Sequence, residues 1–591
     1  MKKKTILSKF EKLKKIHEIH IDIDELYHKY RKKLFVVSFL FLITSVSLLY
    51  FFRTESYKGY ERISFECAGS TLYANLYYPT YGVDFQNKKP LVIYAHGIGN
   101  RRDIDIRAPL ELTKRGFFVV TIDYQAHGES QGQIFDIDEE TDIPALALVC
   151  TNCLDKLEQM DVYKERINPK QIGLLGHSLG GLVVLLNSAL DDRFNTTVTW
   201  AGLVDFELDE LDLPREKKEK IRKYRPSEVV DENTPKNLLA IQHIDDEILP
   251  YEDNALYLRE LTGCELVTIY EPLLGGAHNL YCEKVMIETI QFFEKIFFGS
   301  KYKNGEINLT YDLNFVLIYI SFIALFFTTL SIMLYFSKYF SIKIDYRFIS
   351  EATPKEIEKS EKKSQRKKIF KYILAFVSVW GLSVLFFGIL GLLVAPIIII
   401  LFYAIFKLKA YYNLKPEERD FSIKETLKYQ FDKNAIAYSV FCTFVFLTAY
   451  MIYTGTYPFA FFIPSSIITF VLAFSVYPWY FAFELFYRKI IYPELYYVKS
   501  PLMRIGIVTF LALITQIILL VLALPYSVVQ PVFATFIVSL AVIIINSVVY
   551  EKTKRFGVGI LSSFIIIQIF FGAALQTALS VNSVIHIMLG N

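Results

Sequence analysis

Charge is missing from long parts of this 591-residue sequence. No charged residue lies between Lys433 and Glu484, between Arg504 and Glu551, or after Arg555. The whole chain is 53% hydrophobic and only 21% charged. Because a helix that crosses a bilayer core needs about 20 apolar residues, this pattern excludes a purely soluble protein and predicts several membrane-spanning helices.

The sequence also has few cysteines and almost no excess of positive charge. Six cysteines are too few to define a disulfide framework, and Cys150 and Cys153 have no second pair that would complete a zinc site. The 64 Lys and Arg residues nearly balance the 61 Asp and Glu residues, which leaves no basic surface to attract a nucleic acid. We therefore expect neither a metal centre nor a nucleic-acid partner.

The Lys and Arg residues divide the membrane part into segments. A basic segment, 1–33, precedes an apolar run, 34–52, which lacks a small-x-small cleavage site and is interpreted as an uncleaved anchor. A second predicted span, 315–336, is followed by a basic linker, 338–371, and by a polytopic region, 372–591, with about seven more helices. Because Lys and Arg in short loops stay in the cytoplasm, we expect about nine spans in the cytoplasmic membrane, with the N-terminus inside and the C-terminus outside.

The polytopic region carries very few ionisable side chains inside its apolar runs. Glu484 and Arg488 are four residues apart and are interpreted as an interfacial pair at the cytoplasmic end of a helix. This scarcity disfavours proton-driven transport, which usually needs buried charges. The expected spans are 372–406 (two crossings with a hairpin near Gly388), 435–453, 459–483, 505–524, 532–549 and 558–578.

Region 57–298 has a different character, because it is charged and interrupted by Gly and Pro. Short β-rich runs alternate with longer helical ones, which predicts an α/β fold with a mainly parallel sheet covered by helices. The expected strands are Arg62–Glu66, Leu72–Tyr78, Leu91–Ala95, Phe117–Asp123, Ile172–Leu175, Thr196–Trp200, Leu238–Gln242 and Glu265–Tyr270. The main expected helices are Ile143–Met160, Leu179–Asp191 and His278–Phe297. From the loop charges, we expect this domain on the extracytoplasmic side.

A strand, a G-x-S-x-G motif and a helix follow one another around Ser178. In a nucleophile elbow the serine occupies a strained turn, and small residues two before and two after it let the strand and the helix approach each other. Gly176 and Gly180 occupy those two positions. The motif therefore predicts Ser178 as the nucleophile of an acyl-transfer reaction.

The loop after the strand Leu91–Ala95 reads His-Gly-Ile-Gly and begins at His96. In such sheets this loop supplies one backbone N–H of an oxyanion hole, and the residue after the nucleophile supplies the other. We assign these donors to Ile98 and Leu179, with Gly97 as the loop glycine.

An acid and a base follow the nucleophile in the order Ser, Asp, His. Asp246 comes after the strand Leu238–Gln242, and its spacing to Leu249-Pro250 favours it over Asp245, which stays the alternative. Of the nine histidines, only His278 fits this order within the domain, since it lies in a Gly-rich stretch before the last helix. The alternative for His278 is a surface or helix-capping histidine.

Together these residues resemble the α/β-hydrolase superfamily, in particular its serine esterase, monoacylglycerol-lipase and serine-aminopeptidase-like branch. Segments 70–74, 78–79, 96–101 and 123–130 share the resemblance, which covers about 57–298 and so less than half of the chain. It implies a serine hydrolase in which Ser178, His278 and Asp246 form the triad and no cofactor or metal is needed. One departure is the acid motif, which reads His-Ile-Asp-Asp where relatives usually have a Gly.

An insertion between Gly202 and Lys236 is predicted to form a small cap. Phe206, Leu208, Leu211 and Leu213 alternate with acidic residues and are consistent with a lid over an acyl pocket. A solvated helix with self-paired charges is an equally good interpretation.

We therefore expect a membrane-anchored serine hydrolase that cleaves carboxylic esters of small molecules or lipids beside the bilayer. One alternative is a serine peptidase of the aminopeptidase-like kind. The other is a non-catalytic membrane scaffold or sensor whose hydrolase domain only binds a ligand.

Overall fold

The computed structural model describes residues 23–79, 88–208, 213–273, 276–299, 306–345, 359–413, 423–455, 477–498, 500–523 and 542–568. The described residues form two compact units, one around Thr44–Phe322 and one that contains the remaining helices.

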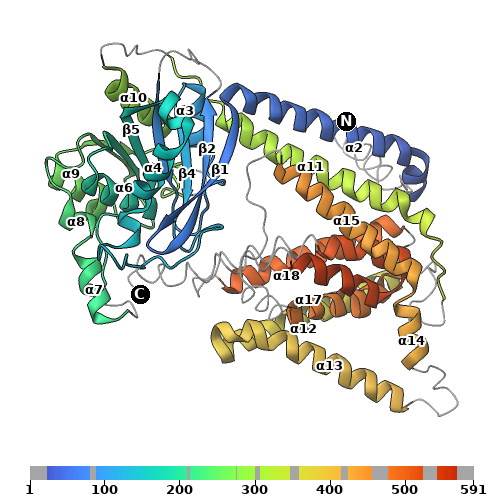
Figure 1. Ribbon diagram of the computed structural model, residues 1–591. Coiled ribbons are helices and arrows are strands. Elements are labelled where there is room, and N and C mark those ends of the chain that lie inside the picture. The colour runs from blue at the N-terminus through green and yellow to red at the C-terminus, as the bar shows by residue number, and fades with distance from the viewer. Residues whose placement is uncertain are drawn as a thin grey trace, which may run out of the picture. The chain divides into compact units, whose positions relative to one another are not determined.

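The first unit contains one eight-stranded sheet (Figure 1). Its strands are β1 (Tyr57–Cys67), β2 (Ser70–Pro79), β3 (Lys89–Ala95), β4 (Phe118–Asp123), β5 (Ile167–His177), β6 (Thr196–Trp200), β7 (Leu238–His243) and β8 (Glu265–Ile269). They lie in the order β1-β2-β4-β3-β5-β6-β7-β8. Strand β2 runs antiparallel to β1 and β4, and all pairs from β4 to β8 are parallel. The predicted α/β class and all eight expected strands are confirmed.

Helices cover both faces of the sheet. On one face, Leu91, Ile93 and Ala95 of β3 belong to the same buried cluster as residues of α4 (Val149–Gln159) and α6 (Leu179–Leu190). On the other face, Val92 and Tyr94 share a cluster with α3 (Arg107–Lys114) and α10 (Glu283–Phe298). Side chains alternate between the faces of a strand, so a strand that is covered on both sides is apolar throughout.

Shorter helices complete this unit: α5 (Asp161–Arg166), α7 (Arg215–Arg222), α8 (Pro226–Val229) and α9 (Tyr257–Thr262). The expected helix 143–160 is divided into a short turn of 3₁₀-helix at Ala145–Ala147 and α4. The expected start of the last helix at His278 is wrong, because α10 begins at Glu283. Leu280 has a left-handed φ of 52°, which a right-handed helix cannot include, so His278 lies in a turn.

The same unit holds the start of a long apolar helix, α11 (Tyr311–Phe336). The buried Glu111 of α3 accepts hydrogen bonds from the N–H groups of Thr310 and Tyr311, both at 2.7 Å. A carboxylate at a helix start satisfies N–H groups that have no partner within the helix. Burial raises the pKa of this carboxyl group. The α/β unit therefore fixes the first turn of α11.

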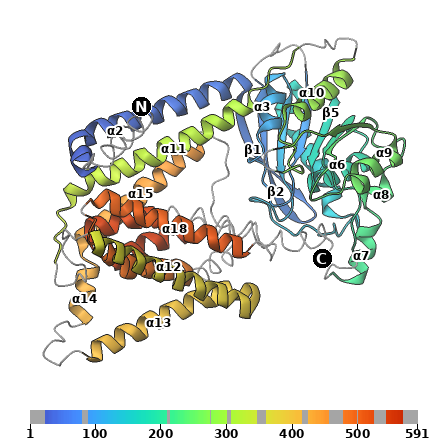
Figure 2. The ribbon, with the colours of Figure 1, turned by 180° about the vertical axis from the view of Figure 1, so that it is seen from behind.

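The second unit is helical. Its elements are most of α2 (Ile23–Ser56) and α11, then α12 (Lys359–Phe387), the turn Gly388–Leu390, α13 (Gly391–Asn413), α14 (Ile423–Gln430), α15 (Lys433–Gly455), α17 (Tyr477–Leu485) and α18 (Pro501–Ala523). Helices α2 and α11 lie side by side (Figures 1 and 2), and the Thr328 hydroxyl donates to the Ser38 carbonyl over 3.0 Å.

Four described helices are long and apolar enough to cross a membrane, by length and composition: Lys32–Phe52, Tyr311–Phe340, Glu361–Phe387 and Pro501–Leu519. The expected reversal within 372–406 coincides with the turn between α12 and α13, where Gly388 has a φ of 57°. The expected spans 459–483, 532–549 and 558–578 lie partly outside the described residues. The number of nine spans and their orientation stay predictions.

The sequence predicted that Glu484 and Arg488 form an interfacial pair. In the structure the two residues lie inside the helical unit. Both side chains are buried, and Arg488 Nε lies 3.2 Å from Glu484 Oε2. Arg488 Nη2 also donates to the Ile543 carbonyl at 2.9 Å and to the Ser547 hydroxyl at 2.7 Å. These bonds join the 486–491 segment to the helix that contains residues 542–553.

Candidate active site

Ser178 occupies a strained turn between β5 and α6. Its φ of 56° and ψ of −119° lie outside the regions that L-residues usually adopt, as in a nucleophile elbow. A Cβ atom added at Gly176 would lie 2.1 Å from the Gly180 carbonyl oxygen, and one added at Gly180 would lie 2.1 Å from the Ala95 carbonyl oxygen. Both positions therefore need glycine because backbone approaches backbone.

Asp246 and His278 meet directly. The His278 Nδ1 atom lies 2.9 and 3.0 Å from the two Asp246 carboxylate oxygens. The carboxylate also accepts hydrogen bonds from the N–H groups of Ile248 and Leu249, both at 2.9 Å, and from Gln242 Nε2 at 3.1 Å. Burial alone would raise the pKa of Asp246, but the bond and charge interaction with His278 and these N–H groups hold it below its usual value.

The alternative acid, Asp245, does not reach His278. Its side chain is exposed, and its N–H donates to His243 Nδ1 at 3.0 Å. Asp246 is buried in the turn that follows β7. The geometry thus favours the acid that the spacing to Leu249-Pro250 indicated.

Ser178 and His278 are linked through the residue that precedes the serine. His177 Nε2 lies 3.0 Å from the His278 carbonyl oxygen. Burial, followed by the nearby His278, lowers the pKa of His177 to about 4, so the ring is neutral and its Nε2–H donates. The Ser178 hydroxyl has no hydrogen-bond partner among the described residues.

The loop that contains Ile98 touches the elbow. A Cβ atom added at Gly97 would lie 2.9 Å from His177 Nδ1 and 3.3 Å from Ser178 Cβ. Leu179 is the first residue of α6, and N–H groups in the first turn of a helix lack a partner within the helix. The loop and the helix start therefore adjoin Ser178, which is the arrangement that an oxyanion hole needs.

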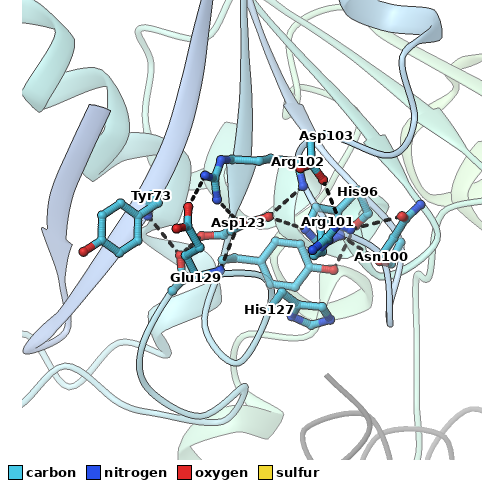
Figure 3. A network of polar contacts seen from close by, with 12 residues as sticks. Tyr73, His96, Asn100, Arg101, Arg102, Asp103, Asp123, His127 and Glu129 are labelled. Atoms are coloured by element: carbon cyan, nitrogen blue, oxygen red, sulfur yellow. Dashed lines mark hydrogen bonds and ion pairs between the residues drawn. The ribbon is translucent and has the colours of Figure 1, made fainter. Parts of the chain in front are cut away.

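A buried charge network holds this loop against the end of β4 and the segment that follows β4 (Figure 3). Arg102 forms ion pairs with Asp123 and Glu129, and its Nε donates to Asn75 at 3.1 Å. The Arg102 backbone N–H also donates to Asp123 Oδ1 at 2.6 Å. Although burial opposes it, the Arg102 charge holds the pKa of Asp123 well below its usual value. The sequence prediction missed Arg102, but a signal existed, because the loops after neighbouring parallel strands meet at one sheet edge.

His127 braces the same loop. Its Nε2 accepts a hydrogen bond from the Gly99 N–H at 3.2 Å, while its Nδ1 lies 2.9 Å from the Gln125 carbonyl oxygen. This pattern requires a neutral ring with the proton on Nδ1. Burial, together with the neighbouring His96, lowers the pKa of His127 to about 3.

An apolar cavity that is open to solvent lies between the cap and the start of α6. Phe206, Ile221 and Tyr224 line it from the cap, and Leu179 lines it from the elbow. Leu208 is buried, Leu213 is half-buried, and Leu211 lies outside the described residues. Of the predicted lid residues that the structure describes, Phe206 lines the cavity, whereas Leu208 and Leu213 are not among its lining residues.

The outer face of the cap matches the other interpretation. Lys220 lies 2.7 Å from Asp142 and 3.1 Å from Glu216, and Arg215 lies 3.0 Å from Glu219. The two interpretations of the insertion thus describe two faces of one segment.

The sheet and the elbow at Ser178 have the arrangement of the α/β-hydrolase fold. Residues 90–227 match the family described as alpha/beta hydrolase fold. The chain is 34% identical over 116 residues to the lysophosphatidylserine lipase ABHD12 of Danio rerio, which covers 19% of this chain and 27% of that protein. It is 29% identical over 136 residues to the quorum-quenching protein AidA of Acinetobacter baumannii (strain MDR-ZJ06), covering 22% of this chain and 40% of that protein. The solved structure of Est1E from Butyrivibrio proteoclasticus with ferulic acid aligns with a TM-score of 0.32, 21% identity and coverage of 40% of this chain and 98% of that chain.

Proposed function

We propose that this chain is a membrane-anchored serine hydrolase that cleaves carboxylic esters through Ser178, His278 and Asp246. The observation that carries the proposal is the 2.9 Å contact between His278 Nδ1 and Asp246, beside a serine in the strained elbow conformation. A positioned acid, base and nucleophile is the arrangement that acyl transfer requires.

In the proposed reaction, Ser178 Oγ attacks the ester carbonyl carbon while His278 takes the hydroxyl proton. Asp246 holds the imidazole with its proton on Nδ1 and stabilises the positive charge that develops. The N–H groups of Ile98 and Leu179 stabilise the oxyanion. His278 then protonates the leaving alcohol, and a water molecule repeats the sequence to release the acid and free Ser178.

The cavity supports an ester whose acyl part is apolar. Leu179, which is also a proposed oxyanion donor, is one of its lining residues, and apolar side chains line it from both the cap and the domain. Burial of each CH₂ group contributes about 0.8 kcal/mol, so an aliphatic chain is favoured there over a charged group. The likeness to a protein named as a lysophosphatidylserine lipase agrees with an ester substrate.

Labelling with a fluorophosphonate probe in native membranes tests the proposal. Wild type should be labelled and should cleave p-nitrophenyl esters, whereas Ser178→Ala should do neither. Ser188→Ala is the matched control, because Ser188 lies on the same helix and its hydroxyl donates to the Val184 and Leu185 carbonyls of that helix. Absence of labelling in folded wild type would favour a ligand-binding scaffold, and labelling with cleavage of peptides alone would favour a peptidase.

The proposal also places the hydrolase domain outside the cytoplasm, which rests on the basic loops. Asp192→Cys, at a side chain that is 98% exposed, should react with an impermeant maleimide in intact cells. Lys363→Cys, in the basic 338–371 linker, is exposed in the structure and should react only after permeabilisation. The reverse pattern would place the domain inside.

A further inference from the structure

The turn that carries His278 is held by side chains rather than by regular secondary structure. Glu247 Oε2 accepts hydrogen bonds from the N–H groups of Ala277, at 2.9 Å, and His278, at 3.2 Å. A Cβ atom added at Gly276 would lie 2.3 Å from Glu247 Oε1, so glycine is needed for the carboxylate to approach. One side of the turn is therefore fixed by a negative charge.

Arg107 holds the other side of the turn. Its Nη1 donates to the Leu280 carbonyl at 2.7 Å, and its Nη2 donates to the Asn279 carbonyl at 3.3 Å. Leu280 has a φ of 52°, a conformation that non-glycine residues keep only when their surroundings fix it. The guanidinium bonds supply such a constraint two residues after His278.

Arg107 is itself immobilised. It is 1% exposed, its Nη2 lies 2.7 Å from Asp105 Oδ2, and the guanidinium lies between the rings of Trp200 and Tyr281, at 4.6 and 4.2 Å from their centroids. Asp105 is held in turn by the Tyr94 hydroxyl at 3.1 Å. A planar donor fixed on two sides defines the positions of the carbonyls it binds.

We propose that Arg107 and Glu247 are positioning residues for His278. Arg107 holds the turn by its carbonyl groups and Glu247 holds it by its N–H groups, so the two opposite charges together fix where the imidazole lies relative to Asp246 and Ser178. This inference rests on the proposed function. Neither residue touches the reacting atoms.

The paired variants Glu247→Ala and Glu247→Gln test the negative side of this clamp. Glu247 is exposed, so neither change should impair folding, and Gln keeps an oxygen that can accept both N–H bonds. We expect Glu247→Ala to lower kcat on a short p-nitrophenyl ester by about tenfold with KM within about twofold, because misplacing a catalytic group slows chemistry more than binding. Glu247→Gln should keep most of kcat. Equal kcat for Glu247→Ala and wild type would overturn the proposal.

Arg107→Lys tests the positive side, since it keeps the charge but loses the fork that reaches both carbonyls. We expect kcat per active site, counted by fluorophosphonate titration, to fall at unchanged KM. Hydrogen exchange of the peptide that contains residues 277–280 is read in parallel and does not depend on activity. Faster exchange is expected in Glu247→Ala and Arg107→Lys, and unchanged exchange in both would overturn the clamp. Wild type that shows no labelling would refute the proposed function instead, while the exchange result still decides the clamp.

Discussion

Arg107 in the α/β unit and Arg488 in the helical unit are both 1% exposed and both pair with a carboxylate, yet they join different parts of the fold. Arg107 donates to carbonyls of the turn that carries His278. Arg488 donates to a carbonyl and a hydroxyl of a neighbouring helix. In the α/β unit, pairing between the strands forms the sheet, and the buried charged side chains hold loops at its edge. In the helical unit they join the helices themselves.

The comparison teaches where a substitution should act. Loss of a buried charge at the sheet edge should change catalysis, since it moves a loop that carries a proposed catalytic group. Loss of a buried charge in the helical unit should change stability and leave catalysis alone, since it leaves an unpaired partner between helices.

The largest effect is expected for Asp246→Asn. An amide cannot hold the imidazole with its proton on Nδ1 facing the acid, and the equivalent change in a serine protease lowers kcat about 10⁴-fold. Steady-state hydrolysis of a short p-nitrophenyl ester measures this loss. Asp245→Asn is the matched control and should retain nearly all activity, because Asp245 is exposed. Equal losses in both variants would contradict the assignment of the acid.

Gly180→Ala should prevent the α/β unit from folding. The added Cβ atom would lie 2.1 Å from the Ala95 carbonyl oxygen, and backbone clashes of this kind cost more than about 4 kcal/mol. Pulse proteolysis of the full chain in detergent reports the folded fraction. Gly59→Ala should behave like wild type, because a Cβ atom there meets nothing within 4 Å. A wild-type folded fraction for Gly180→Ala would show that the elbow is less tightly packed than the 2.1 Å approach indicates.

Arg488→Ala tests the helical side of the comparison. It leaves the buried Glu484 carboxylate without its partner, which typically costs about 3–5 kcal/mol. We expect the full chain to aggregate at a lower temperature in detergent while kcat stays at the wild-type value. The double variant Glu484→Leu with Arg488→Leu should regain much of the stability, because an apolar pair replaces the charges. A fall in kcat for Arg488→Ala would break the distinction between the two units.

Acid should weaken the brace that His127 gives to the oxyanion loop. Burial keeps the pKa of His127 at about 3, below its ordinary 6.5. Below pH 6.5 the unfolded chain therefore binds a proton at this residue, whereas the folded chain does not. Stability therefore falls as pH falls, by about 2 kcal/mol between pH 8 and pH 5 for this group. Urea midpoints from pulse proteolysis should show this loss in wild type but a smaller loss in His127→Gln. Parallel pH curves would contradict a buried neutral ring.

The sequence predicts the sheet well because most of its strands are short apolar runs bounded by Gly, Pro or charged residues. The elbow is predictable for a similar local reason, since Gly176 and Gly180 lie two residues on either side of Ser178. The start of α10 is not, because the turn before it is fixed by Arg107, which is 173 residues away from Leu280 in sequence. No local sequence pattern can indicate a hydrogen bond between residues that far apart.

The cap offers the smallest expected effect and compares its two faces. Phe206 lines the apolar cavity, so Phe206→Ala should extend the space for an acyl chain. One methylene in an apolar pocket is worth about 1–3 kcal/mol, and we expect the ratio of kcat/KM for a decanoyl over a butanoyl ester to rise about tenfold. Lys220→Ala, on the outer face, removes only surface ion pairs, which contribute little, so its ratio should equal that of wild type. A shift of the same size in Lys220→Ala would show that the outer charges, not the apolar lining, set the chain-length preference.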